Sequence, residues 1–224
     1  MFVKVCGTTS EEDALLAVAM GADAVGFIFA AGSKRQVAPA LVRDIVKRLP
    51  PETLTVGVFR DEAPERVIEI VRATGLKAAQ LHGHETPEQT QQVRSQIPIV
   101  FKVFSAGDPA VRRAREHRAD AVLVDNKGGG TGQVFDWRLA EDVPGGVRLV
   151  LAGGLGPDNV AEAIRTVHPW GVDAASKLES SPGRKDARKV RAFVAAAREA
   201  APEPEVDELG ELGDRPYDWM EHGG

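Results

Sequence analysis

The sequence predicts an α/β protein, a single (β/α)8 TIM barrel with its active site at the carboxyl ends of the strands. Apolar segments rich in β-branched residues alternate with amphipathic segments at intervals of roughly 25 residues. Eight such pairs indicate a closed parallel barrel, because a doubly wound open sheet usually has fewer strands and a dominant first phosphate-binding loop. The length of 224 residues suits one barrel, since such barrels have about 200 to 250 residues.

The strand segments are apolar at their centres, as expected for strands buried on both faces of a parallel sheet. We expect strands at residues 2–6, 24–29, 53–59, 78–82, 99–104, 121–125, 148–152 and 172–175. We expect helices at residues 11–20, 39–48, 64–74, 87–96, 109–117, 136–141, 157–167 and 185–199, the sixth being short. Several of them start at proline, whose missing N–H is tolerated in the first helical turn.

Composition limits the class of protein. The hydrophobic fraction of 43% supports one sizeable core, and no apolar run approaches the ~18 residues of a membrane span. The start of the sequence reads as a strand without the apolar region of a signal peptide. The single cysteine, Cys6, excludes an internal disulfide and a cysteine-based metal cluster. We therefore expect a cytoplasmic protein that binds no metal and no membrane, and the net charge of −5 gives no footprint for nucleic acid.

Charge and proline divide the chain into two parts. Residues 201–224 hold eight acidic residues, one basic residue and three prolines. Such a segment has too little apolar surface to fold alone. We expect residues 1–200 to form the catalytic barrel and residues 201–224 to be a disordered acidic tail.

The barrel topology brings strand ends together, because barrel enzymes place their active sites at the carboxyl ends of the strands. The residues at or just after the predicted strand ends are Cys6, Phe29, Phe59, His82, Asp125, Gly153 and Ser176. We expect these residues to share one open end of the barrel.

Two of these residues can carry acid–base chemistry. Cys6 is followed by Gly7 and is either a buried apolar residue or a base, which would need a nearby cation to favour the thiolate. Asp125 either caps a turn or acts as an acid. The glycine-rich residues 128–132 that follow it are longer than a turn needs, which favours a lid that excludes water.

Other polar positions suggest binding of a phosphorylated substrate. Gly153 and Gly154 follow strand seven and Ser176 follows strand eight, where barrels often bind phosphate through backbone N–H groups; the alternative for the glycine pair is a tight turn. Arg35 lies in a polar loop after strand two and is either solvated or a bidentate clamp for a carboxylate. His82 either orients substrate or closes strand four by a hydrogen bond.

Together the motifs resemble the phosphoribosylanthranilate isomerase family. The matching segments run in order through residues 1–198: 4–9 (KVCGTT), 21–23 (GAD), 26–29 (GFIF), 33–35 (SKR), 56–59 (VGVF), 80–83 (QLHG), Asp125 with 129–132 (GGTG), 135–137 (FDW), 151–155 (LAGGL) and 182–186 (PGRKD). The resemblance implies a TIM barrel that needs no cofactor. It also implies an aldose–ketose isomerisation, the Amadori rearrangement of N-(5'-phosphoribosyl)anthranilate, the third step from chorismate to tryptophan.

The resemblance assigns roles residue by residue. Asp125 matches the general acid that protonates the furanose oxygen, and Cys6 matches the general base that removes the proton from ribose C2. Arg35 matches the residue that holds the anthranilate carboxylate. Gly154 and the loop around Ser176 match the phosphate site.

One position departs from the family pattern. Lys177 stands where the family usually has glycine in the phosphate loop. If that position needs positive φ, the lysine strains the loop, whereas its ammonium can instead contact phosphate. We expect Lys177→Gly to improve substrate affinity, and a weaker KM would show that Lys177 contributes to binding.

Two alternatives to the isomerase stay open at this point. One is another phosphate-binding barrel enzyme, such as indole-3-glycerol-phosphate synthase or a related ribose-phosphate isomerase, although the synthase normally uses a lysine acid and paired glutamates. The other is a noncatalytic ligand-binding barrel, supported only by Lys177 and the acidic tail. The resemblance is compatible with either a monomer or a homodimer.

Overall fold

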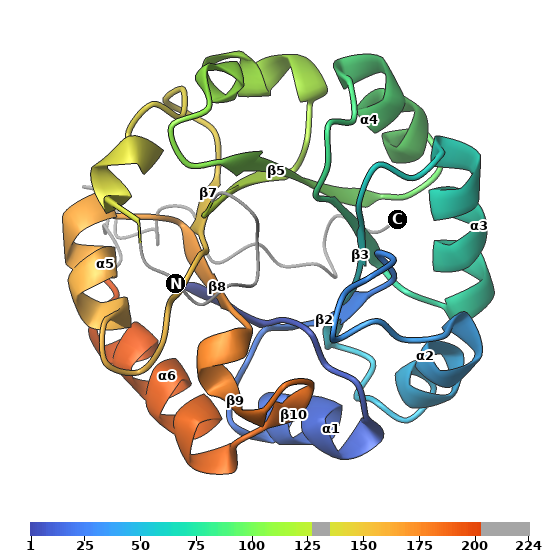
Figure 1. Ribbon diagram of the computed structural model, residues 1–224, viewed down its shortest axis with the longest axis horizontal. Coiled ribbons are helices and arrows are strands. Elements are labelled where there is room, and N and C mark those ends of the chain that lie inside the picture. The colour runs from blue at the N-terminus through green and yellow to red at the C-terminus, as the bar shows by residue number, and fades with distance from the viewer. Residues whose placement is uncertain (127–134, 203–224) are drawn as a thin grey trace, which may run out of the picture.

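The computed structural model describes residues 1–126 and 135–202. Its eight parallel strands pair in sequence order and close into a barrel, with the helices outside (Figure 1). The strands are β1 (Phe2–Val5), β2 (Ala24–Ile28), β3 (Leu54–Phe59), β4 (Ala78–Leu81), β5 (Ile99–Ser105), β6 (Ala121–Asp125), β7 (Leu149–Leu151) and β8 (Gly171–Ala174). The predicted (β/α)8 barrel is confirmed, and each predicted strand overlaps an observed one.

The α-helices are α1 (Glu11–Ala19), α2 (Pro39–Val46), α3 (Pro64–Thr74), α4 (Pro87–Arg94), α5 (Val160–Val167) and α6 (Ala187–Glu199). Two predicted helices are 3-10 helices instead, η1 (Pro109–His117) and η2 (Trp137–Ala140). In η1 the buried residues Val111, Ala114 and His117 are spaced three apart, which matches the three residues per turn of a 3-10 helix.

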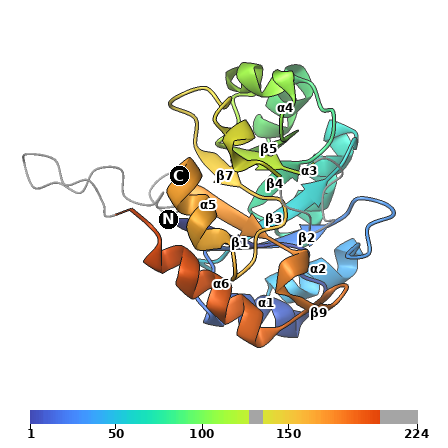
Figure 2. The ribbon, with the colours of Figure 1, turned by 60° about the vertical axis from the view of Figure 1, so that its left-hand side comes forward.

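The last helix starts at Ala187, two residues later than predicted, because a small hairpin precedes it. After β8 the chain forms a 3-10 turn, η3 (Ser176–Leu178), and then strands β9 (Glu179–Ser181) and β10 (Arg184–Lys185). These two strands pair antiparallel with each other, outside the barrel. The hairpin lies beside α1 (Figures 1 and 2). The sequence patterns did not predict it, since strands of two and three residues show no periodicity.

Apolar side chains form two separate cores, one on each face of the barrel wall. The inner core fills the barrel and includes Phe2, Leu54, Phe101 and Leu123. The outer core lies between strands and helices and includes Phe59, against which Phe29 packs. The prediction that Phe29 and Phe59 face the open end is therefore wrong. Side chains alternate across a strand, and both phenylalanines point toward the helices.

Two expectations fall outside the described residues. The predicted lid, residues 128–132, and nearly all of the acidic tail belong to the ranges 127–134 and 203–224. In the part of the chain that the structure describes, no helix is long and apolar enough to cross a membrane.

Candidate active site

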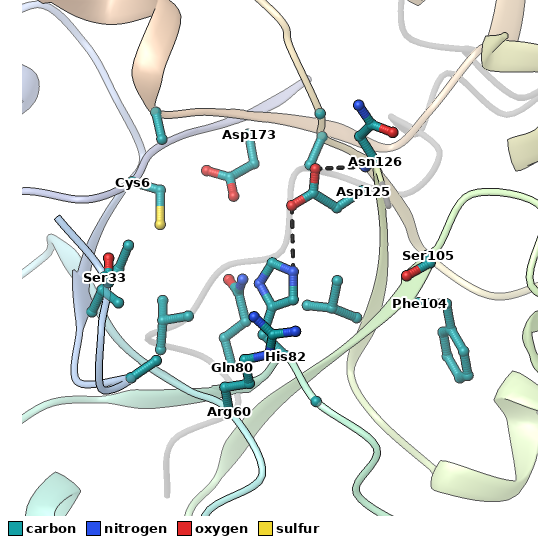
Figure 3. Close-up of a pocket in the computed structure, with 18 of the residues that line it drawn as sticks. Cys6, Ser33, Arg60, Gln80, His82, Phe104, Ser105, Asp125, Asn126 and Asp173 are labelled. Atoms are coloured by element: carbon teal, nitrogen blue, oxygen red, sulfur yellow. Dashed lines mark hydrogen bonds and ion pairs between the residues drawn. The ribbon is translucent and has the colours of Figure 1, made fainter. Parts of the chain in front are cut away.

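A cavity of about 1090 Å³ opens at the carboxyl ends of the strands. Its lining includes the predicted site residues Cys6, Arg35, His82, Asp125, Gly153, Gly154 and Ser176. It also includes Gln80 and Asp173, for which the sequence analysis assigned no role. Figure 3 shows the side chains of Cys6, Asp173, Asp125 and His82 directed into one space from four different strands or strand ends. The structure thus brings together residues far apart in the sequence.

The alternation of side chains explains why this end of the barrel is polar. Phe2 and Lys4 both face inward on β1, and Cys6 continues that face just after the strand. On β6, Leu123 and Asp125 follow the same rule. The inner face of β1 and of β6 therefore changes from apolar to polar toward the open end, so the apolar core supports polar groups above it.

Cys6 is buried, and a glycine on the next strand makes room for it. A Cβ on Gly26 would lie 2.8 Å from Cys6 Sγ and 3.2 Å from Lys4 Nζ. Burial raises the pKa of the thiol, and the Lys4 ammonium acts in the opposite direction. A free thiol at this position can serve as a base only when a cation supports the thiolate.

Asp125 is held by two contacts at the end of β6. Its Oδ2 lies 3.3 Å from His82 Nε2, and its Oδ1 accepts a hydrogen bond from the Asn126 N–H at 2.7 Å (Figure 3). Gly153 has a φ of 82°, and a Cβ there would lie 2.9 Å from Asp125 Oδ1. Glycine is therefore required for the loop after β7 to pass so close to this carboxylate.

Arg35 is already paired with a carboxylate of the hairpin. Its Nε and Nη2 donate to Glu179 Oε1 and Oε2 at 2.6 and 2.8 Å, and this hydrogen bonding raises the pKa of the guanidinium. These contacts use two of its five N–H donors, so the group can still bind a second carboxylate. Gly7 lets the stem of Arg35 pass, since a Cβ there would be 2.5 Å from Arg35 Cδ.

Lys185 joins three elements beneath this pair. Its Nζ donates to the carbonyl oxygens of Cys6 at 2.6 Å and Ala175 at 3.2 Å, and lies 3.3 Å from Glu179 Oε1. Burial lowers the pKa of Lys185, and Glu179 opposes that shift. The hairpin that the sequence patterns missed thus supplies the residues that anchor Arg35.

The two loops expected to bind phosphate also lie at the cavity. Asn159 orders the loop after β7, donating to the Gly154 carbonyl at 3.0 Å and accepting from the Gly156 N–H at 2.8 Å. Ser176 begins η3 and lines the cavity, whereas Lys177 is exposed and is absent from the lining. Among the described residues, those with positive φ other than glycine are Asp61, Arg118 and His168. Lys177 therefore does not strain this loop.

Two buried oxygens at the cavity have no hydrogen-bond partner in the described structure, Gln80 Oε1 and Asp173 Oδ1. Buried acceptors are normally satisfied, so these two can receive donors from a bound molecule. Period-two alternation gives a signal that could have found both residues, since Gln80 faces the same way as Ala78 and Asp173 the same way as Gly171. In residues 1–126 and 135–202, no group of three His, Cys, Asp or Glu side chains is placed to hold a metal.

A closed parallel barrel with a thiol, a carboxylate, an imidazole and a guanidinium around one cavity defines a class, the barrel enzymes that work by acid–base chemistry. The profile described as N-(5'phosphoribosyl)anthranilate (PRA) isomerase matches residues 3–196. The chain belongs to the N-(5'-phosphoribosyl)anthranilate isomerase family. The predicted family, TIM-barrel fold and isomerase activity in tryptophan biosynthesis are confirmed.

Individual relatives agree over almost the whole barrel. An isomerase of this name from Desulforudis audaxviator is 47% identical over 202 residues, which cover 88% of this chain and 98% of the relative. The crystal structure of the isomerase from Thermus thermophilus has 41% identity and a TM-score of 0.84, covering 89% of this chain and 99% of the other. Another structure is described as an isomerase in complex with reduced 1-(o-carboxyphenylamino)-1-deoxyribulose 5-phosphate. It is 37% identical, has a TM-score of 0.78, and covers 89% of this chain and 99% of the other.

Proposed function

We propose that the chain isomerises N-(5'-phosphoribosyl)anthranilate with Cys6 as the general base and Asp125 as the general acid. The observation that supports these roles most directly is that the thiol and the carboxylate line one cavity from β1 and β6. Two groups on different strands can address different atoms of one sugar, which an internal proton transfer requires.

The proton transfers follow from this placement. Asp125 gives a proton to the furanose ring oxygen, and the ring opens to a Schiff base between the anthranilate nitrogen and ribose C1. Cys6, as thiolate, then takes the proton from C2, and the electron pair moves to form an enolamine. Tautomerisation of the enolamine gives the ketone product. The contacts of Asp125 with His82 and the Asn126 N–H orient the carboxylate for the first step.

The remaining groups bind the two ends of the substrate. Arg35, through the donors that Glu179 leaves free, holds the anthranilate carboxylate. Gly153, Gly154 and Ser176 bind the phosphate through backbone N–H groups, where glycine permits close approach. The unpartnered oxygens of Gln80 and Asp173 accept hydrogen bonds from sugar hydroxyls. Lys177, which is exposed, contributes at most its charge.

Fluorescence decay of freshly generated substrate tests the two roles. We expect Cys6→Ser and Asp125→Asn to slow turnover by about 10²–10⁴-fold each, the usual contribution of a positioned acid or base. Asp120→Asn is the matched control, since Asp120 precedes β6 at its amino end and accepts the Val100 N–H at 2.8 Å. Turnover by both site variants within threefold of the unmodified chain would contradict the roles.

We also propose the wider setting. Residues 1–200 form the catalytic barrel and residues 201–224 an acidic appendage, so deletion of 201–224 should leave kcat unchanged. The partner is a small phosphorylated molecule, the protein is cytoplasmic, and it is a monomer or a homodimer. A relative from Thermotoga maritima is described as dimeric, and sedimentation of this chain would decide between the two states.

A further inference from the structure

Lys4 is a charged residue that the proposed reaction does not use, and it lies next to two residues of the cavity lining, Cys6 and Asp173. It lies on the inward face of β1 and is 0% exposed. Its Nζ is 2.9 Å from Asp173 Oδ2, because Lys4 and Asp173 are register partners on the neighbouring strands β1 and β8. A lysine ammonium is almost never fully buried unless it is paired, so this ion pair holds it in place.

The same ammonium lies beside the sulfur of Cys6. Nζ and Sγ both approach the site of the missing Gly26 side chain, at 3.2 and 2.8 Å from the Cβ position. One cation therefore faces two acids, the Cys6 thiol and the Asp173 carboxyl. In a buried cluster, one cation balances one anion, so the two acids compete for the same counter-charge.

We propose that Lys4 is a positioning residue for the base: its buried ammonium, held by Asp173, is the counter-charge that stabilises the thiolate form of Cys6. The inference rests on the proposed role of Cys6 and adds what makes that role possible. A thiolate in an apolar pocket is otherwise unfavourable.

The charge balance supports the assignment. Burial raises the pKa of Cys6, and Lys4 exerts the strongest opposing effect, while the Asp173 charge raises the pKa further. Burial alone would lower the pKa of Lys4, but Asp173 and Cys6 raise it above its usual value. Lys4 therefore stays charged, and the negative charge of Asp173 partly offsets the effect of Lys4 on the pKa of the Cys6 thiol.

Three other charged groups lie near Cys6 from the hairpin and the loop after β2. Lys185 also lowers the pKa of the thiol, but its ammonium donates to the Cys6 carbonyl and lies 3.3 Å from Glu179. Arg35 is likewise paired with Glu179. Lys185 meets the backbone carbonyl of Cys6 and Arg35 is turned toward Glu179, whereas Lys4 Nζ lies beside the sulfur itself. Lys4 accordingly lowers the pKa of the thiol more than Lys185 does.

The chain has one cysteine, so thiolate formation can be read without ambiguity. We would titrate the full chain by thiolate absorbance near 240 nm and by the rate of iodoacetamide alkylation as a function of pH. In Lys4→Met the alkylation rate near pH 7 should fall about tenfold or more, since an opposite charge within a few ångströms shifts ionisation by at least that factor. In Asp173→Asn the rate should rise, because the competing anion is gone.

Opposite shifts distinguish an electrostatic role from general damage to the site, which would move both variants in the same direction. The double variant Lys102→Met with Glu85→Gln is the matched control, because it removes another buried lysine and its carboxylate partner without leaving an unpaired charge, and its alkylation profile should equal that of the unmodified chain. An unshifted profile in folded Lys4→Met would overturn the proposal. If Lys4→Met does not fold, Asp173→Asn decides, and an unchanged or slower alkylation there overturns it. The titration holds whether or not Cys6 is the base, which the turnover of Cys6→Ser tests separately.

Discussion

Two buried lysine–carboxylate pairs lie on opposite faces of the barrel wall, and they differ in how completely they are satisfied. On the outer face, Lys102 contacts Glu85 at 2.6 Å and donates to the Gly83 carbonyl at 2.8 Å. Glu85 also accepts the N–H groups of Asp61 and Gly83, both at 2.9 Å. Both carboxylate oxygens are used, and the pair fixes the loop after β4 against β5.

On the inner face, Lys4 contacts Asp173 at 2.9 Å, but Asp173 Oδ1 has no partner in the described structure. A buried acceptor without a donor costs about 1–3 kcal/mol, so the inner pair is kept at the expense of stability. Carboxylates of both pairs line the same cavity, so the comparison rests on hydrogen bonding. The complete pair serves the fold, whereas the pair with an acceptor left open indicates a ligand.

The largest effect is expected from a substitution that breaks the outer pair. Lys102→Met leaves the Glu85 carboxylate buried without its cation, which should lower the free energy of unfolding by about 3–5 kcal/mol. Denaturant unfolding measures it. Adding Glu85→Gln should restore part of the loss, because the double variant has no unpaired charge. A loss below about 1 kcal/mol in Lys102→Met would show that the outer pair does not hold the fold.

The second prediction concerns the inner pair and has the opposite pattern. Removing both charges, in the double variant Lys4→Met with Asp173→Asn, leaves no unpaired ion in the barrel, so the free energy of unfolding should change by less than about 1 kcal/mol. The Kd for the reduced product analogue should rise about tenfold, because hydrogen bonds to charged groups are about twice as strong as neutral ones. Isothermal titration with Glu85→Gln as the control separates the two patterns. Normal affinity combined with a large loss of stability would make the inner pair structural as well.

The sequence patterns predicted the strands well because most strand residues are apolar and buried and the strands are bounded by polar turns. Cys6 and Asp125 were found because each ends a strand. Lys4 and Asp173 were not assigned a role, although the alternation rule places Lys4 on the same face as Cys6. A lysine at an inward position of a buried strand is a conflict between residue type and environment, and such conflicts gather at functional sites.

What the patterns missed depends on pairing between distant segments. The contact of Arg35 with Glu179 spans 144 positions in the sequence, and neither residue has a local feature that reveals the other. The hairpin of β9 and β10 is too short for a periodic signal. The pattern of η1 predicts a helix but not its type, because a spacing of three residues between buried side chains fits one face of either a 3-10 helix or an α-helix.

A third prediction compares the buried pair of Arg35 and Glu179 with an exposed one. Burial would raise the pKa of Glu179, but hydrogen bonds from Arg35 and the charge of Lys185 hold it below the usual 4.5. The unfolded chain therefore takes up this proton at a higher pH than the folded chain. The stability that the pair confers is present above pH 4.5 and is lost as the pH falls through the pKa that Glu179 has in the folded chain.

Unfolding measured from pH 6 down to pH 3 tests this sign. Over that range, the free energy of unfolding of Glu179→Gln should fall by about 1–2 kcal/mol less than that of the unmodified chain, because the variant lacks the charged hydrogen bonds. Glu116→Gln is the control, because the Arg113–Glu116 pair is exposed and such pairs contribute little. Equal pH slopes for Glu179→Gln and the unmodified chain would contradict the assignment.

The smallest expected effect is that of Lys177→Gly. The expectation that glycine improves affinity depended on a strained backbone, and Lys177 is not among the residues with positive φ. Its side chain is exposed, so only a screened attraction to the substrate phosphate remains. We therefore expect KM to rise by less than about threefold, within the usual range for surface substitutions. Lys177→Met keeps the Cβ and removes the charge, so equal KM values for the two variants would assign the effect to charge. A KM lower only in the glycine variant would instead restore the idea of an obstructed phosphate loop.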